Sequence, residues 1–222
     1  MKGVFITGTD TGVGKTWFSQ KFIQALCAKG IDVVPRKPVE SGWVDDVQQT
    51  DAGKLAQAAG KESQLDTICP NRFEDPVSPV RAAQLKNKRI TLENLKEQCF
   101  YGIKKDQFLL LEGAGGFYSP LCSDGLNADL AETLGFPVIL VVADKLGCIN
   151  HALLTIEAIR RRQLDLVAVV LNHTSTAERQ ETNMDNLQDL KQLVKNTPVY
   201  PLAYNASGRE TLNQLVHLLG VE

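Results

Sequence analysis

The stretch Gly8-Thr9-Asp10-Thr11-Gly12-Val13-Gly14-Lys15-Thr16 decides the fold of this chain. The apolar run at 4–6 before it predicts a buried strand, and apolar residues recur at helical spacing over 17–26 after it. A strand, a glycine-rich turn that ends in Gly-Lys-Thr, and a helix are together typical of a phosphate-binding loop. We therefore predict that Lys15 contacts the β- and γ-phosphates of a nucleotide and that the Thr16 hydroxyl is a ligand of Mg²⁺.

The loop departs from the commonest form of this motif in one place. The usual pattern has its first glycine where Thr9 stands, and here the glycine lies one residue earlier, at Gly8. An ordinary glycine turn between a strand and a helix is the alternative interpretation. The Gly-Lys-Thr ending, in its strand, turn and helix context, favours phosphate binding.

Composition limits the function classes. The 222 residues, 43% of them hydrophobic, fit one α/β domain over 1–222. The net charge of −2 gives no support for a nucleic-acid partner. Five scattered cysteines form no C-x-x-C pair and indicate reduced thiols. No apolar run reaches the roughly 18 residues of a membrane span, and the chain starts directly with a strand, so we expect no membrane association and a cytoplasmic location.

Predicted strands and helices alternate along the chain. Strands are expected at 4–6, 31–34, 108–111, 138–142, 165–171 and 199–202, and helices at 14–29, 52–59, 91–105, 126–134, 148–162 and 211–219. Three prolines interrupt 60–88, which we expect to be an excursion over the active-site side. The alternation predicts a three-layer, doubly wound and mainly parallel sheet that carries a P-loop.

Charged residues follow two of the predicted strands. Lys37 comes just past the strand at 31–34, at the edge where ligands bind to open α/β sheets. It is either a second cation for the γ-phosphate or a solvated surface lysine. Asp51 begins a helix, where it is either a favourable first-turn acid or a Mg²⁺ carboxylate. Position alone does not decide either question.

Glu112 ends another apolar strand and is followed at once by Gly113-Ala114-Gly115-Gly116. An acid at the tip of a second strand is the Walker-B arrangement, which holds Mg²⁺ directly or through water. The glycines let the backbone approach a ligand closely. A plain glycine turn is the alternative, and the phosphate-binding loop upstream favours the functional interpretation.

Several segments together resemble the dethiobiotin synthetase family, the ATP-dependent carboxylases of biotin biosynthesis. Besides the loop, the resemblance depends on Lys37-Pro38-Val39-Glu40-Ser41-Gly42, Thr50-Asp51, Glu112-Gly113-Ala114-Gly115-Gly116, Leu146-Gly147-Cys148-Ile149-Asn150-His151-Ala152 and Asn172. These elements cover the chain from end to end in the expected order. The resemblance implies a cyclo-ligase that uses ATP and Mg²⁺ to convert 7,8-diaminopelargonate and CO₂ to dethiobiotin, through a carbamate and a carbamic–phosphoric anhydride.

The resemblance also implies roles for individual residues. Lys37 and Lys15 are the expected catalytic residues, and Thr16, Asp51 and Glu112 the expected metal ligands. The expected ATP-binding residues are Gly12, Val13, Gly14, Lys15, Thr16, Trp17, Asp51, Glu112, Gly113, Ala114, Gly115, Asn172, His173, Pro201, Leu202 and Ala203. The substrate is expected to contact Thr11, Ser41, Leu146, Gly147 and Asn150. In this family the substrate carboxylate lies against a helix N-terminus of a second subunit, so the resemblance implies an obligate homodimer.

Three other functions fit parts of the sequence. Switch ATPases of the partitioning or septum-site type share this loop, but they carry a lysine where this chain has Asp10. A ligase of the cobyrinate amidating type needs a glutaminase domain of ~200 residues, which we do not expect in addition to the domain at 1–222. A nucleotide-binding scaffold without catalysis predicts no role for Lys37.

Overall fold

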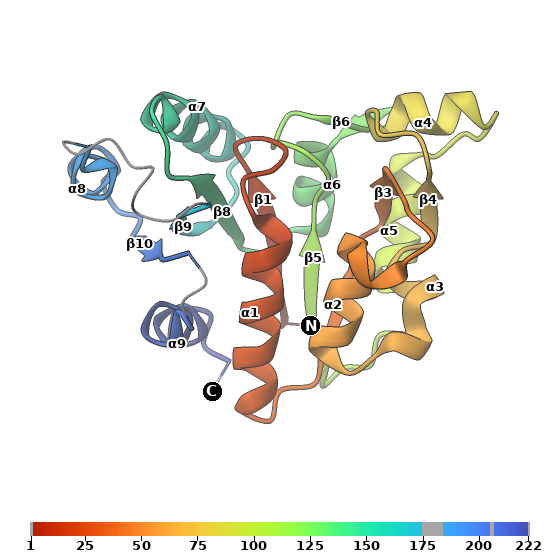
Figure 1. Ribbon diagram of the computed structural model, residues 1–222, viewed down its shortest axis with the longest axis horizontal. Coiled ribbons are helices and arrows are strands. Elements are labelled where there is room, and N and C mark those ends of the chain that lie inside the picture. Colours follow the sequence, from red (N-terminus) through yellow and green to blue (C-terminus); the bar gives the residue numbers. More distant parts are fainter. Residues whose placement is uncertain (1, 175–183, 205–206, 222) are drawn as a thin grey trace.

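A six-stranded parallel sheet forms the centre of the computed structural model, which describes residues 2–174, 184–204 and 207–221 (Figure 1). The strand order is β10-β9-β8-β1-β5-β2. The strands are β1 (Lys2–Gly8), β2 (Val33–Arg36), β5 (Phe108–Glu112), β8 (Val138–Ala143), β9 (Leu166–Asn172) and β10 (Val199–Leu202). All five neighbouring pairs are parallel, as the alternation of strands and helices predicted.

Helices cover both faces of the sheet. One apolar core joins the sheet to α1 (Lys15–Ala28), α2 (Asp51–Ala59) and α9 (Arg209–Leu218). The other core joins the opposite face to α5 (Leu92–Phe100), α6 (Asn127–Leu134), α7 (Cys148–Arg161) and α8 (Asn186–Leu193). The predicted three-layer arrangement is therefore confirmed. The central strand β8 is buried along its whole length, as expected for a strand covered on both faces.

Among the predicted elements, one strand is shifted along the chain and one helix is too long. The strand expected at 31–34 lies at Val33–Arg36 and includes Pro35, which is tolerated because β2 is an edge strand of the described sheet. The helix expected over 91–105 ends at Phe100, and Gly102 then takes a positive φ of 70°. Helix α8 was not predicted.

The excursion expected over 60–88 contains short regular elements. These are a 3₁₀ turn at Glu62–Gln64, α3 (Leu65–Ile68), β4 (Asn71–Phe73) and α4 (Pro79–Leu85). Strand β4 pairs with β3 (Val39–Ser41) in a small second sheet. A 3₁₀ turn at Val47–Gln49 precedes α2, and β6 (Pro120–Cys122) pairs with β7 (Gly125–Leu126). The N–H of Lys37, just past the end of β2, donates to the Ile68 carbonyl of this excursion over 2.8 Å, and Figure 1 shows α3, β4 and α4 to the right of β5.

β5 and β8 are consecutive strands of this sheet along the chain, and they lie on opposite sides of β1. The direction of winding therefore reverses between β1 and β8. In such sheets the crevice outside the carboxyl ends of the strands binds ligands. β1 ends at Gly8, β2 at Arg36 and β5 at Glu112. The phosphate-binding loop, Lys37 and Glu112 therefore meet at the same edge.

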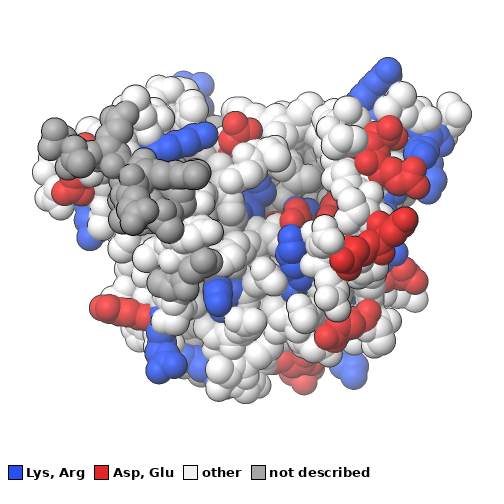
Figure 2. All heavy atoms as spheres, viewed as in Figure 1, with Lys and Arg blue, Asp and Glu red and all other residues white. Residues whose placement is uncertain are grey.

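The surface around this edge carries both signs of charge. Figure 2 shows lysines and arginines interspersed with aspartates and glutamates and no broad basic field on this face. Among the described residues, every helix is too short or too polar to cross a bilayer.

A substitution at Gly53 tests how closely α2 packs against the preceding 3₁₀ turn. Alanine in place of a helical glycine ordinarily stabilises by roughly 1 kcal/mol. Here a Cβ on Gly53 would overlap the carbonyl of Val47, so we expect Gly53→Ala to lower the free energy of unfolding by about 1–3 kcal/mol. Chemical denaturation measures the effect. Lys54→Ala, the next helix position, is the control, and a Gly53→Ala variant at least as stable as the parent would contradict the prediction.

Candidate active site

The phosphate-binding loop joins β1 to α1 at the edge of the sheet. Gly14 precedes α1 with a left-handed φ of 90°, a conformation that glycine adopts without strain. A Cβ there would overlap the amide nitrogen of Asn172. Lys15 is buried, and its Nζ donates to the Asp10 carbonyl over 2.9 Å. The loop is thus already shaped around its lysine.

Lys37 lies between two carboxylates. Its Nζ is 2.8 Å from Glu112 Oε1 and 3.0 Å from Asp51 Oδ2, and it also donates to the Gly113 carbonyl over 3.2 Å. The side chain is 3% exposed. The Thr16 hydroxyl donates to the same Glu112 oxygen over 2.7 Å. Lys37 is therefore a buried cation of the site, and the surface-lysine interpretation is wrong.

The charges of this cluster shift the pKa values of its members. Burial alone would lower the pKa of Lys37, but Glu112 and Asp51 outweigh it and hold that pKa above its ordinary value. Burial alone would raise the pKa of Asp51, but the attraction to Lys37 outweighs burial and lowers that pKa below its ordinary value. Lys37 and Asp51 therefore remain charged at neutral pH.

Lys15 behaves differently. Burial, followed by repulsion from Lys37, lowers its pKa from 10.5 to about 8. Its carboxylate neighbours only partly oppose this shift. An added negative charge near Lys15, such as a phosphate oxygen, would raise this pKa and favour the protonated form of the lysine.

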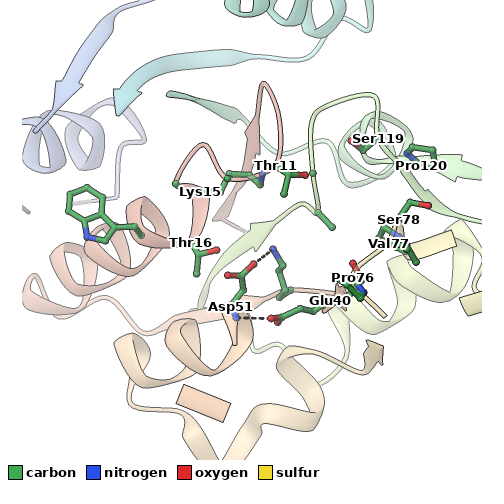
Figure 3. A pocket seen from close by; sticks show the side chains of 18 residues that line it. Thr11, Lys15, Thr16, Glu40, Asp51, Pro76, Val77, Ser78, Ser119 and Pro120 are labelled. Carbon is green, nitrogen blue, oxygen red and sulfur yellow. Dashed lines mark hydrogen bonds and ion pairs between the residues drawn. The ribbon is translucent and has the colours of Figure 1, made fainter. Parts of the chain in front are cut away.

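A cavity of about 670 Å³ opens beside these residues. From the loop and the first turn of α1, it is lined by six of the predicted residues: Thr11, Gly12, Gly14, Lys15, Thr16 and Trp17. Lys37, Ser41 and Asp51 line it as well, with Ala114 and Gly115 from the loop after β5. Figure 3 shows Thr16 and Asp51 on one side of the cavity and Pro76–Ser78 on the other.

Asn127 holds the loop after β5. Its Oδ1 accepts the N–H of Ala114 over 3.0 Å, and its Nδ2 donates to the Gly116 carbonyl over 3.1 Å. A Cβ on Gly113 would come within 2.7 Å of the Asn127 Oδ1. The backbone after Glu112 is therefore kept close to a buried amide.

Another group of predicted nucleotide contacts lies behind the loop. Asn172 ends β9 and donates to the Val13 carbonyl over 2.9 Å, while its buried Oδ1 has no hydrogen-bond partner. His173 pairs with Asp144 over 3.1 Å. Pro201 and Leu202 belong to β10, beside β9, and Ala203 follows them on the surface. None of these residues lines the 670 Å³ cavity.

The segment at 146–150 lies away from the cavity. Gly147 precedes α7 with a φ of 86°, and Asn150 lies in the first turn of that helix, exposed. Leu146 is 73% exposed. The described cavity lining includes no residue of this segment, so within one chain it does not join Lys37 and Ser41.

The site residues fit a magnesium ion bound together with a nucleotide. No group of three or more His, Cys, Asp and Glu side chains among the described residues is placed to hold a metal alone. Mg²⁺ usually takes one or two carboxylates and completes its shell with water and substrate phosphates. Asp51, Glu112 and Thr16 supply such a partial set, and the buried Oε2 of Glu112 has no hydrogen-bond partner.

Sequence reasoning missed several residues of the site. Glu40, Ser119, Pro120 and the stretch at 76–79 also line the cavity, and Asn127 supports it from α6. Their positions depend on contacts between distant segments. The prolines of the excursion were a signal for a loop over the site but not for particular lining residues.

Comparisons with known proteins agree with this architecture. A family model described as an AAA domain matches residues 2–203. The septum site-determining protein MinD of Pyrococcus horikoshii, solved with Mg-ADP, superposes with a TM-score of 0.59 at 18% identity, over 98% of this chain and 94% of that one. This likeness shows the fold alone.

Sequence relatives are more specific. The ATP-dependent dethiobiotin synthetase BioD of Anaeromyxobacter dehalogenans is 35% identical over 222 residues, which cover 100% of this chain and 99% of the relative. The protein of the same name from Thermodesulfovibrio yellowstonii is 34% identical over 202 residues, 86% of this chain and 84% of the relative. With the loop, Lys37 and Glu112 at one edge of the sheet, the chain belongs to the dethiobiotin synthetase family.

Proposed function

We propose that this chain carboxylates 7,8-diaminopelargonate with CO₂ and closes the ureido ring of dethiobiotin, with ATP converted to ADP and phosphate. The observation that carries the proposal is the cavity that places Lys37 and Ser41 beside the phosphate-binding loop. Such a cavity accommodates a small acceptor next to the terminal phosphate of a nucleotide. Family membership supplies the identity of that acceptor.

The reaction divides into three steps. One amine of the substrate adds to CO₂ and loses a proton, which gives a carbamate. A carbamate oxygen attacks the γ-phosphorus, and the bond to the β-phosphate oxygen breaks as ADP leaves. The second amine then attacks the carbamate carbon, loses a proton and expels phosphate, which closes the ring.

The two lysines would stabilise the negative charge that develops on the γ-phosphate in the second step. Lys15 and Lys37 provide positive groups at the γ-phosphate, where preorganised charge stabilises the transition state. Lys37 also lines the cavity, where it would hold the carbamate. Ser41 and Thr11 offer hydroxyls to the reacting end of the diamine.

Thr16, Asp51 and Glu112 would hold Mg²⁺, which when bound neutralises charge on the β- and γ-phosphates. Residues 12–17, from the loop and the first turn of α1, would surround the phosphates and ribose. Asn172 would read the base through its unpartnered Oδ1, with His173 and residues 201–203 nearby.

Diamine-dependent turnover tests the proposal. ADP release is measured with ATP, Mg²⁺ and bicarbonate, with and without 7,8-diaminopelargonate, and dethiobiotin is identified by mass spectrometry. We expect ADP and dethiobiotin to appear in equal amounts only when the diamine is present. ATP hydrolysis that is indifferent to the diamine would instead indicate a switch ATPase.

We also infer that the active site is completed by a second copy of this chain. Leu146 and Leu154 are 73% and 60% exposed, and Tyr118 is 50% exposed. Leu154 and Tyr118 line one surface depression together with Asp10. An apolar surface of this kind, next to the loop, suits a homodimer contact. Residues 146–150 of the partner would then receive the substrate carboxylate at the N-terminus of α7.

Mixing two inactive variants checks the shared site. Lys37→Ala impairs the phosphate half, and Asn150→Asp adds a negative charge where the substrate carboxylate would dock. Random exchange of subunits would place one intact site in each heterodimer and restore about a quarter of the parental activity. Mixed dimers that stay as inactive as either variant would contradict a site shared between subunits.

A further inference from the structure

Glu40 is a buried acid in the wall of the cavity for which the reaction proposed above has no role. It lies on β3 and is 6% exposed. Its two carboxylate oxygens accept the backbone N–H groups of Asp51 over 2.7 Å and of Ala52 over 2.9 Å. Figure 3 shows the Glu40 side chain joined to the amide of Asp51 at the cavity.

These contacts satisfy the beginning of α2. The first N–H groups of a helix have no partner within the helix and require capping. The Thr50 hydroxyl accepts the N–H of Gly53 over 3.0 Å, and Glu40 accepts the two N–H groups of Asp51 and Ala52. Negative charge near this end of the helix is also favourable.

The arrangement leaves the carboxylate of Asp51 available for the site. An aspartate in a first turn is attracted to the positive end of its own helix. Here Glu40 occupies those amides from another strand, and the Asp51 carboxylate turns to Lys37, 3.0 Å away. Two hydrogen bonds to the backbone at 51–52 restrict both the position and the rotation of this first turn.

We propose that Glu40 is a positioning residue, which fixes the first turn of α2 so that Asp51 reaches Lys37 and the magnesium of the nucleotide. This inference rests on the proposed function in that it assigns Asp51 to the nucleotide-bound metal. Glu40 acts through the backbone of Asp51 and not by contact with the reacting atoms.

Two variants of Glu40 and a matched control test the proposal. Glu40→Ala removes both acceptors, and Glu40→Gln keeps one. Thr50→Ala removes a cap from the same helix end but leaves the Glu40 contacts to residues 51–52 in place. We expect all three to lower the melting temperature, and only the Glu40 variants to lower kcat, by about 10- to 100-fold as for groups that orient metal ligands.

A second readout does not require turnover. Isothermal calorimetry compares ADP binding with and without Mg²⁺. We expect Glu40→Ala to weaken the Mg²⁺-dependent part about 10- to 100-fold and to leave metal-free ADP binding near the parental value. Because this measurement uses no diamine, it tests the role of Glu40 even if the chain acts on another acceptor. Failure of the proposed function would instead appear as diamine-independent hydrolysis by the parent protein.

A double-mutant cycle with Asp51→Asn shows whether Glu40 acts through Asp51. If it does, adding Glu40→Ala to Asp51→Asn causes little further loss of Mg²⁺-dependent binding, because the two effects are not additive. Fully additive losses would overturn the proposal and indicate direct contact of Glu40 with ligand. Glu40 variants that match Thr50→Ala in both kcat and Mg²⁺-dependent binding would also overturn it, since Glu40 would then be only a helix cap.

Discussion

Replacing Lys37 with alanine is expected to lower diamine-dependent ADP release by about 100-fold or more, because a preorganised charge at the transferring phosphoryl group is lost. ATP binding should persist, since the backbone of the loop, Lys15 and Thr16 come from another segment. Steady-state kinetics and calorimetric ATP titration measure the two effects separately. An alanine variant with near-parental turnover would contradict the catalytic role of Lys37.

The same substitution removes the partner of two carboxylates. Loss of one member of a buried ion pair typically costs 3–5 kcal/mol of folding free energy, so Lys37→Ala should also unfold at lower denaturant concentration. Lys37→Arg keeps the charge and therefore separates the effect on turnover from the effect on stability. It should fold normally but still lose turnover, because a guanidinium does not reproduce the position of a single ammonium.

Lys86→Ala is the matched control for a lost lysine. Lys86 forms an exposed ion pair with Glu74 over 3.2 Å, and such surface pairs contribute only about 0–1 kcal/mol. Lys86 lies outside the lining of the main cavity. Its replacement should change neither turnover nor stability by a comparable amount, so an equal loss would point to a general effect of removing positive charge.

Gly14→Ala is the second substitution with a large expected effect. Gly14 has a φ of 90°, and an added Cβ would overlap Asn172. Holding a non-glycine residue in this conformation costs about 1–3 kcal/mol, and each 1.4 kcal/mol is a tenfold change in affinity. Since the variant loop would relax and must return to its binding shape, we expect ATP affinity to fall about 10- to 100-fold or more.

Substitutions at two other glycines distinguish the backbone strain of a positive φ from a steric clash of the added Cβ. Gly12 also has a positive φ, of 74°, but an added Cβ would have nothing within 4 Å, so Gly12→Ala should weaken ATP binding less than Gly14→Ala. Gly30, with a φ of 79° and equally open space, lies past the end of α1, far from the loop in sequence. Gly30→Ala should change stability only. Equal losses of affinity at Gly14 and Gly30 would contradict a local effect on the loop.

Local sequence signals were sufficient for most of the fold. The apolar runs predicted all six strands of the main sheet, because strands covered by helices on both faces carry continuous apolar residues. They misplaced β2 by two residues. The observed strand includes Pro35, which is acceptable because β2 is an edge strand of the described sheet. The helix after Thr91 was extended too far because the left-handed turn at Gly102 was not anticipated.

The site was predicted only in part. The loop and the Glu112 strand end carry recognisable patterns. The roles of Lys37 and Asp51 stayed open because a surface lysine and a favourable first-turn acid fit the same sequence positions. The role of Glu40 was not predicted, since its partners at 51–52 meet it only where β3 approaches α2. Asn127 likewise reaches the loop after β5 from a helix that begins later in the chain.

The sequence by itself determined that a phosphate-binding loop follows the first strand of a parallel, doubly covered sheet, and its motifs identified the family. Only the tertiary structure decided which charges meet there. Lys37 and Glu112 are 75 positions apart in the chain, and Thr16 and Glu112 are 96 apart. Periodicity and turn chemistry act over a few residues. The convergence of these side chains depends on the order in which parallel strands pack, which brings their carboxyl ends to one edge.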